Sequence, residues 1–368
     1  MENFTLDITR QVVWIDGTAV SADTIAEVAA GYAEREEDFG TQVIGFLKEW
    51  FDDSDTVLVH TSGSTGSPKP MWVEKERMIA SAVLTCSFLG LHRGDTALLC
   101  MPLQYIAGKM VVVRALVAGM RLLTVSPCGH PLDGLDQVPD FAAMIPMQVY
   151  NSLQVPAERS MLQQVRSLII GGGAVDAALA DVLHGFPYGV WSTYGMTETL
   201  SHVALRRLNG EEASDWYTPL PGVDIRVNAK GALCILAPRV CSVELVTNDV
   251  AECNERGQFR ILGRKDNIIN SGGVKIQIEQ VEELLRPHMS APFMITAAPH
   301  PKFGEEVVML LQNNGQQLPV DEVVAMCRQI LPVYWQPKRI MAVSELPMTG
   351  TGKPDRATAR KMAAHSLD

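Results

Sequence analysis

The chain has 368 residues and a formal charge of −11, with 47% hydrophobic and 20% charged residues. This length can bury a sizeable core and predicts two or three domains of a globular protein. The acidic balance argues against a general nucleic-acid binder, because neutralising a phosphate backbone needs clustered Lys and Arg. A local basic pocket for a nucleotide remains compatible with this composition.

The cysteines and the apolar segments exclude further classes. Seven cysteines, with no C-x-x-C pair, predict reduced structural thiols and neither a disulfide framework nor a zinc site. The N-terminus lacks the basic-then-apolar order of a signal peptide. The most hydrophobic region, 96–125, is interrupted by Lys109, Arg114 and Arg121, so no stretch of about 20 apolar residues could span a membrane. We expect a cytoplasmic protein.

Strand and helix patterns alternate through the first half of the chain. Two helical patterns precede residue 55, and in the second Val43, Phe46, Leu47 and Trp50 have the spacing of one buried helix face. Strands are expected at 12–15, 56–60, 96–100, 121–125, 167–170 and 190–192, and helices over 75–90, 106–118 and 175–184. This alternation predicts a mostly parallel sheet covered by helices. Three loops (61–69, 171–174 and 193–198) would then lie beyond the carboxyl ends of strands, where such sheets bind ligands.

The character changes after residue 205. Short β-rich pieces over about 205–262 suggest a small antiparallel sheet or barrel. Beyond 263 an α+β pattern begins, with helices at 278–288 and 320–331 and strands near 293–298, 306–311 and 338–343. The predicted fold class is α/β, with a large N-terminal domain over 1–264 that includes the β-rich subdomain, and a C-terminal domain over 265–368.

A loop rich in glycine and hydroxyl groups follows the apolar run 56–60. It comprises Thr61, Ser62, Gly63, Ser64, Thr65, Gly66, Ser67, Pro68 and Lys69. Such a loop can hold a phosphate chain, because glycines allow close approach, hydroxyls and amides donate hydrogen bonds, and a lysine supplies charge. A surface turn is the alternative. Lys69 lies between two prolines, which does not match a Walker P-loop and argues against a mononucleotide kinase or a GTPase.

Residues 193–199 and Asp249 could complete a nucleotide site. Tyr194 could stack on a base, and Glu198 could hold Mg²⁺ beside phosphates; alternatively, Thr197 caps a helix whose first turn is acidic. Asp249 could accept both ribose hydroxyls, or it could be a turn aspartate.

Two further polar segments allow alternative readings. Residues 263–267 join the two expected domains and could be only a polar linker. Residues 347–354 form a glycine-rich loop that presents Lys353, which could equally be a solvated surface lysine.

Together these segments resemble the adenylate-forming superfamily of acyl-CoA synthetases, luciferases and peptide-synthetase adenylation domains. The resemblance covers roughly residues 56–356 and rests on the phosphate loop, Tyr-Gly-Met-Thr-Glu at 194–198, the Asp249 segment, Gly-Arg-x-Asp at 263–266, Ile-x-x-Ser-Gly-Gly at 268–273 and Thr-Gly-Lys at 351–353. It implies ATP and Mg²⁺ as cofactors, CoA as a cosubstrate and a C-terminal domain that rotates.

The resemblance also implies roles by position. The loop 61–69 would hold the ATP phosphates, above all through Ser62, Thr65 and Lys69, and Gly172, Gly173 and Ala174 would border the adenine. Tyr194 would stack on the base next to Gly195, Thr197 would bind the α-phosphate and Glu198 would hold Mg²⁺. Asp249 and Arg264 would bind the ribose, Asp266 would be the hinge, Gly272 and Gly273 would line the thiol tunnel, and Lys353 would serve adenylation.

The chain departs from the family in two places. Only 60 residues precede the phosphate loop, fewer than is usual, so much of the N-terminal subdomain is expected to be missing; a second subunit, as in a homo-oligomer, could cover the exposed face. Residues 102–105 align with the family's Pro-Leu-aromatic-His motif, but Tyr105 stands where the histidine usually lies. Compact members resemble o-succinylbenzoate–CoA ligases of menaquinone synthesis.

This resemblance implies an aromatic acid with a second carboxylate, which would need a cation deep in its pocket. Lys109 is placed to supply this cation, and His202 is a second candidate; a helix-surface lysine and a satisfied polar histidine are the alternatives. Tyr105 is the third predicted substrate contact. We expect an AMP-forming acid–CoA ligase, best an o-succinylbenzoate–CoA ligase. The alternatives are another aryl- or acyl-CoA ligase and a non-catalytic nucleotide-binding relative.

Overall fold

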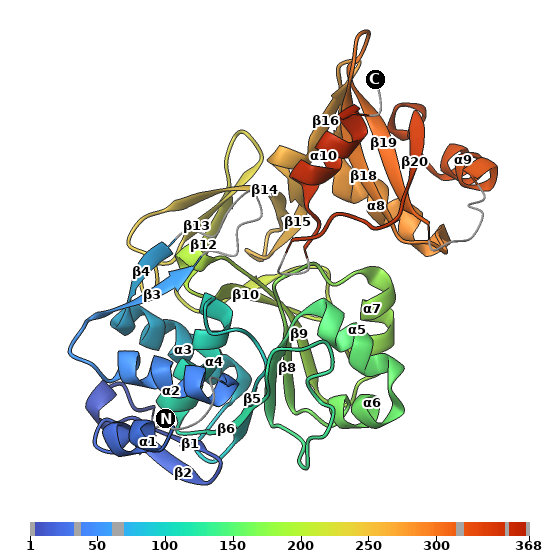
Figure 1. Cartoon of the computed structure of the whole chain (residues 1–368). Coiled ribbons are helices and arrows are strands. Elements are labelled where there is room, and N and C mark those ends of the chain that lie inside the picture. The colour runs from blue at the N-terminus through green and yellow to red at the C-terminus, as the bar shows by residue number, and fades with distance from the viewer. Residues whose placement is uncertain (1–3, 33–37, 61–69, 314–319, 350–352, 366–368) are drawn as a thin grey trace.

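The computed structural model describes residues 4–32, 38–60, 70–313, 320–349 and 353–365. Within these ranges the strands form three larger sheets and one hairpin. Figure 1 shows the C-terminal sheet set apart from the large N-terminal body, with β15 leading into it. No helix in the described part of the chain is long and apolar enough to cross a membrane.

The largest sheet has nine strands in the order β11-β10-β9-β8-β7-β5-β6-β1-β2. Their bounds are β1 Val12–Ile15, β2 Thr18–Ser21, β5 Thr96–Leu99, β6 Arg121–Thr124, β7 Phe141–Met144, β8 Ser167–Ile170, β9 Gly189–Gly195, β10 His202–Arg207 and β11 Thr218–Pro219. From β9 to β1 each neighbouring pair is parallel, and antiparallel strands lie at both edges. The predicted mostly parallel sheet is therefore confirmed.

Helices cover both faces of this sheet, as Figure 1 shows. They are α1 Ile25–Tyr32, α2 Phe39–Trp50, α3 Lys75–Leu89, α4 Ile106–Ala118, α5 Pro146–Gln154, α6 Pro156–Leu162 and α7 Ala177–His184. Side chains alternate along each strand: on β5, Leu98 packs with the core under α5–α7, while Ala97 and Leu99 pack with the core under α2–α4. Helices α3 and α4 end at Gly90 and Gly119, whose φ angles of 63° and 68° suit glycine.

The strand before the predicted phosphate loop does not belong to the large sheet. Strand β3 (Thr56–His60) is buried through Val57 and Val59, as predicted, but it pairs antiparallel with β4 (Pro70–Glu74) in a separate hairpin. Strand β4 is not predicted from the sequence because Pro70 argues against a strand, although proline is tolerated at a strand's first residue. The loop itself, 61–69, lies outside the described residues.

A four-stranded antiparallel sheet follows the large one. It comprises β12 Asp224–Val227, β13 Ala232–Leu236, β14 Leu245–Cys253 and β15 Phe259–Arg264. The prediction of an antiparallel sheet in this region is right, but its start near residue 205 is wrong, because β10 and β11 extend the large sheet instead. Strand β15 leads into the short 3₁₀ helix η3 (Lys265–Asn267); the domain boundary predicted there stays a prediction.

The last part of the chain forms a five-stranded sheet with three helices in the described residues. The elements are β16 Ile268–Ser271, β17 Val274–Gln277, α8 Ile278–Leu285, β18 Phe293–His300, β19 Gly304–Gln312, α9 Val320–Ile330, β20 Arg339–Val343 and α10 Arg356–His365. Helix α10, which the sequence did not predict, is held by Arg356. Its two terminal nitrogens donate to the two carboxylate oxygens of Glu282 on α8, at 2.6 and 2.8 Å.

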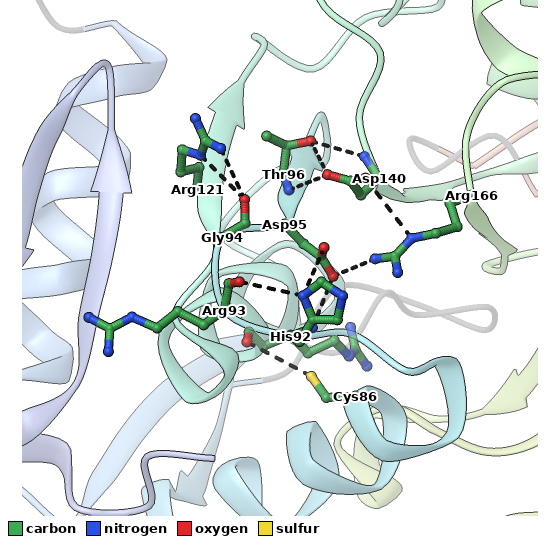
Figure 2. A network of polar contacts seen from close by, with 10 residues as sticks. Cys86, His92, Arg93, Gly94, Asp95, Thr96, Arg121, Asp140 and Arg166 are labelled. Carbon is green, nitrogen blue, oxygen red and sulfur yellow. Dashed lines mark hydrogen bonds and ion pairs between the residues drawn. The ribbon is translucent and has the colours of Figure 1, made fainter. Parts of the chain in front are cut away.

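A polar network ties together the amino ends of the central strands (Figure 2). Asp95, which is 5% exposed, accepts a hydrogen bond from Arg166 and lies 3.2 Å from Nδ1 of His92. The Asp140 carboxylate accepts from both the backbone nitrogen and the hydroxyl of Thr96, at 2.8 and 2.9 Å. Apart from His92, these residues immediately precede or begin β5, β7 and β8, so the network stabilises the edge opposite to the one that forms the site.

Candidate active site

A cavity of about 520 Å³ lies at the carboxyl ends of the parallel strands. Its walls include Met101 after β5, Ile145 after β7, Gly171 and Gly172 after β8, and Thr193 near the end of β9. This is the edge on which the alternating pattern placed the ligand site. The loops at 171–174 and 193–198 both contribute residues to it, as their positions predicted.

Two glycines keep part of this wall thin. Gly172 has a φ angle of 78° and a side chain there would approach Ile145. At Gly195 a Cβ atom would lie 2.2 Å from the carbonyl oxygen of Ser201. Neither position therefore accommodates a larger residue without a shift of the backbone, and the cavity keeps direct access to the main chain of β8 and β9.

The C-terminal domain reaches this cavity through Lys353. Its backbone pairs with the segment at 348–349, since the Thr349 nitrogen donates to the Lys353 carbonyl at 2.7 Å and Met348 forms an antiparallel bridge with Pro354. Burial, and then the positive charge of Arg264, lowers the pKa of Lys353. The structure thus brings the predicted lysine of the tail together with the predicted residues of the N-terminal domain.

The segment after β9 turns sharply at the cavity edge. Thr197 begins the 3₁₀ helix η2 (Thr197–Thr199) and lines the cavity, whereas Glu198 is exposed beside it. The residue at the helix N-cap is Met196, so Thr197 is not the cap of a longer helix. Leu200 then adopts a φ angle of 64°, which is uncommon for a residue with a side chain, and this turn carries Ser201 and His202 back toward the cavity.

A chain of polar contacts joins β9, β14 and β15 next to the domain junction. The Tyr194 hydroxyl donates to Asp249 Oδ2 at 2.5 Å, and Arg264 Nη1 lies 3.0 Å from Asp249 Oδ1. Arg264 Nη2 lies 3.1 Å from Asp266 Oδ2. Burial and the Asp249 carboxylate raise the pKa of Tyr194, so its hydroxyl stays protonated and can keep donating. The four residues predicted for the nucleotide and the hinge therefore contact one another, and their roles stay predictions.

A buried cation that the sequence reasoning missed lies at the deep end of the cavity. Arg114 of α4 is 2% exposed and lines the cavity. Its Nη2 donates to Ser201 Oγ at 2.5 Å, while its Nε is buried without a hydrogen-bond partner in the described part of the chain. Burial lowers the pKa of Arg114 to about 10, which leaves it charged at neutral pH. A charged residue in the middle of an apolar helix was the available signal, because burying a charge is costly unless the charge is paired.

His202 lies beside this cation. Its Nε2 is 3.0 Å from the buried hydroxyl of Thr85, and its Nδ1 is 3.4 Å from Ser201 Oγ. Burial, and then the charge of Arg114, lowers the pKa of His202 well below its usual value. The imidazole is therefore neutral and contributes hydrogen bonds, not charge, to the cavity wall.

The structure does not place Lys109 in the cavity. Its ammonium lies 2.7 Å from Glu49 Oε2 on α2 and 4.6 Å from the centre of the Phe46 ring. The prediction of Lys109 as the buried substrate cation is corrected accordingly: Arg114 faces the cavity and Lys109 faces α2. The reason is geometric, since five residues along a helix rotate a side chain by about 140°.

The remaining predicted residues are distributed as follows. Tyr105 and His202 line the cavity. Gly173 and Ala174 are exposed after β8, and Gly272 and Gly273 form the turn between β16 and β17 with φ angles of 58° and 84°. Thr61, Ser62, Gly63, Ser64, Thr65, Gly66 and Lys69 lie outside the described residues. The roles assigned to all these residues stay predictions.

Comparison with known proteins agrees with the fold and with the predicted family. A family model described as AMP-binding enzyme matches residues 4–240, and one described as AMP-binding enzyme C-terminal domain matches residues 291–353. The chain belongs to this family and is an adenylate-forming enzyme of the acid–CoA ligase class.

The similar proteins include several ligases. The 2-succinylbenzoate–CoA ligase of Bacillus cereus (strain AH820) is 25% identical over 337 residues, which cover 83% of this chain and 69% of that protein. An acyl-CoA synthetase (AMP-forming)/AMP-acid ligase II-like protein from Dyadobacter fermentans is 33% identical, with a TM-score of 0.61 over 90% of this chain and 96% of the other.

The o-succinylbenzoate CoA synthetase of Bacillus subtilis shares the fold. Its complex with the acyl-adenylate OSB-AMP has a TM-score of 0.74 at 17% identity, over 97% of this chain and 95% of the other. Another structure of the same enzyme holds ATP and a magnesium ion. At this identity the likeness shows the fold alone.

Proposed function

We propose that this chain is an ATP- and Mg²⁺-dependent acid–CoA ligase that activates o-succinylbenzoate. The acid's carboxylate attacks the α-phosphorus of ATP to give an acyl-adenylate and pyrophosphate; the CoA thiol then attacks the acyl carbon and releases AMP. One observation carries this proposal: Lys353, near the C-terminus, lines the same cavity as Thr197 and Gly172.

Lys353 suits the first half-reaction on electrostatic grounds. Two anions must meet when a carboxylate attacks a phosphate, and the pentavalent phosphorus gathers further negative charge. A cation that is held at this point stabilises the transition state more than the ground state, and one such group is typically worth about 10²–10³ in rate. Thr197 would bind the α-phosphate from the opposite wall.

The contacts around Asp249 suit a ribose. Its carboxylate is oriented by Tyr194 and Arg264, and it could exchange one of these partners for the two ribose hydroxyls. Gly172 would border the adenine because it offers no side chain, and Tyr194 would lie beside the base. These assignments follow the order of the family motifs.

The donor set at the edge of the cavity fits magnesium. Mg²⁺ takes one or two carboxylates and completes its shell with phosphate oxygens and water, so the exposed carboxylate of Glu198 beside Thr197 is sufficient. The described residues contain no cluster of three or more His, Cys, Asp or Glu that would form an all-protein metal site. When bound, the ion would neutralise part of the phosphate charge.

The deep end of the cavity favours an acid with a second carboxylate. Arg114 supplies a buried positive charge there, and apolar residues such as Met101, Ile145 and Leu200 line the walls. A buried carboxylate is tolerated only when it is paired, and the free Nε of Arg114 offers it a hydrogen bond. o-Succinylbenzoate has an aromatic ring and two carboxylates. It also agrees with the names of the curated relatives.

The second half-reaction needs a different arrangement. Lys353 must leave the cavity before a thiol can enter, so we assign Asp266 as the hinge of the C-terminal domain and Gly272 and Gly273 as part of the thiol tunnel. Conformational closure and opening of this kind is a common rate-limiting step in enzymes.

A pyrophosphate-release assay tests the proposal. Purified protein is given ATP, Mg²⁺ and each of a panel of acids: o-succinylbenzoate, benzoate, malonate, medium-chain fatty acids and amino acids. We expect o-succinylbenzoate to give the highest kcat/KM, and AMP and the CoA thioester to form only when CoA is added. Binding of ATP with no pyrophosphate from any acid would instead support a non-catalytic nucleotide-binding relative.

A further inference from the structure

Tyr105 stands where the family usually has a histidine, and the cavity holds another histidine nearby. The motif at 102–105 ends in Tyr105 where the family usually has a histidine, and this removes an imidazole from the cavity wall. His60, the last residue of β3, lines the same cavity. It comes from a different segment of the chain, the hairpin that packs outside the large sheet.

The backbone places His60 directly beside Tyr105. The two residues form a parallel β-bridge, and the His60 nitrogen donates to the Gln104 carbonyl at 3.2 Å. Paired residues in neighbouring strands lie about 4.8 Å apart and point to the same face. The imidazole therefore leaves the backbone next to the tyrosine ring and on the same side.

The His60 ring is available to a ligand. It is partly exposed and lines the cavity, and no side-chain hydrogen bond to another described residue occupies it. A neutral imidazole offers one N–H donor and a protonated one offers two. Both forms can donate to a carboxylate or phosphate oxygen, which is the anionic chemistry that the cavity is proposed to hold.

We propose that His60 binds the reacting carboxylate of the acid and so replaces the imidazole that the family usually presents from the position of Tyr105. This inference rests on the proposed function. In this assignment Lys353 lies on the side of the phosphate, Arg114 binds the far end of the acid, and His60 holds the carboxylate oxygen that attacks phosphorus. The chain would have moved the imidazole across one β-bridge without losing it.

Moving the imidazole back tests this assignment. We expect His60→Ala to lower kcat/KM for the acid about 10²- to 10³-fold, in the range typical of a lost hydrogen-bond donor to a reacting group, with little change in the KM for ATP. The double variant His60→Ala, Tyr105→His should recover most of that loss. Tyr105→His alone completes the double-mutant cycle.

Two controls separate a substrate contact from a structural role. His184→Ala removes an exposed histidine at the end of α7, which does not line the cavity, and should leave kcat/KM unchanged. The urea unfolding midpoint of each variant shows whether the hairpin still packs. A role of His60 in packing alone would lower the midpoint and would not be rescued by Tyr105→His.

The outcomes are distinct. If the wild type releases pyrophosphate and His60→Ala is as active, or if folded His60→Ala gains nothing from Tyr105→His, the inference about His60 is wrong and the proposed function stands. If the wild type releases no pyrophosphate with any acid, the proposed function itself is wrong.

Discussion

The deep end of the cavity and the junction with the C-terminal domain are built differently. At the deep end, Arg114 and His202 are almost completely buried and are held by short hydrogen bonds to Ser201 and Thr85. At the junction with the C-terminal domain, the side chains of Arg264 and Asp266 are 37% and 45% exposed. The deep end is a fixed part of the core, whereas the junction consists of contacts that water can replace.

This difference matches two tasks. A buried guanidinium is costly to desolvate and costly to leave unpaired, so in the proposed function it would discriminate between acids with and without a second anionic group. An exposed ion pair contributes only about 0–1 kcal/mol, so the junction can open and close at little cost. Specificity is thus expected from the deep end, and alternation between half-reactions from the junction.

The largest expected effect is at Lys353. We predict that Lys353→Ala lowers the rate of acyl-adenylate formation by about 10²–10³, because the cation that offsets the charge at phosphorus is lost. The reaction of a supplied acyl-adenylate with CoA should be nearly unchanged. Pyrophosphate release and thioester formation are measured separately, and an equal loss in both half-reactions would contradict the assignment.

The next effect concerns the deep end. We predict that Arg114→Met lowers kcat/KM for o-succinylbenzoate about 10²-fold and changes kcat/KM for benzoate much less, since only the first acid has a carboxylate to pair. Lys109→Met is the matched control, because it removes a buried cation from the same helix that pairs with Glu49 outside the cavity. That variant should be less stable but keep its preference, and a lost preference in Lys109→Met would refute the comparison.

The buried histidine predicts a pH-dependent stability. Because the folded chain lowers the pKa of His202, only the unfolded chain takes up this proton below its usual pKa of about 6.5. The free energy of unfolding should therefore fall as the pH drops below about 6.5, by up to about 1.4 kcal/mol per pH unit, and be unaffected above it. Urea titrations from pH 5 to 8 measure this slope. In His202→Gln the unfolding free energy should change less steeply with pH.

Much of the fold and part of the site could be predicted because their signals are local. The β-then-α periodicity gave the parallel sheet, and glycine turns marked the strand ends that border the cavity. The segments around Thr197, Asp249 and Lys353 could be found because each is a short run of unusual residues. Topology places Thr197 at the carboxyl end of the parallel sheet, whereas the approach of Lys353 to the same cavity is seen only in the structure.

The errors arose where a contact depends on the three-dimensional direction of a side chain. Lys109 and Arg114 are five residues apart on α4, and spacing alone does not tell which face meets the cavity and which meets α2. Strand β3 pairs with β4, which lies beyond the phosphate loop and starts with Pro70, so no local pattern around β3 reveals its partner. His60 becomes a candidate only through its bridge to Tyr105, a pairing that no local pattern indicates.

The smallest expected effect lies at the junction. We predict that Asp266→Asn changes the free energy of unfolding by no more than about 0.5 kcal/mol, because its ion pair with Arg264 is solvent-exposed. It should still alter the ratio of the two half-reaction rates several-fold, since the contact from Arg264 to Asp266 exists in the arrangement that places Lys353 in the cavity. Glu244→Gln removes another exposed carboxylate, which pairs with Arg226 on the small sheet, and should leave that ratio unchanged. If the ratio shifts equally in both variants, the pair of Arg264 and Asp266 has no special role in domain alternation. The contrast between a fixed deep end and a movable junction would then need another basis.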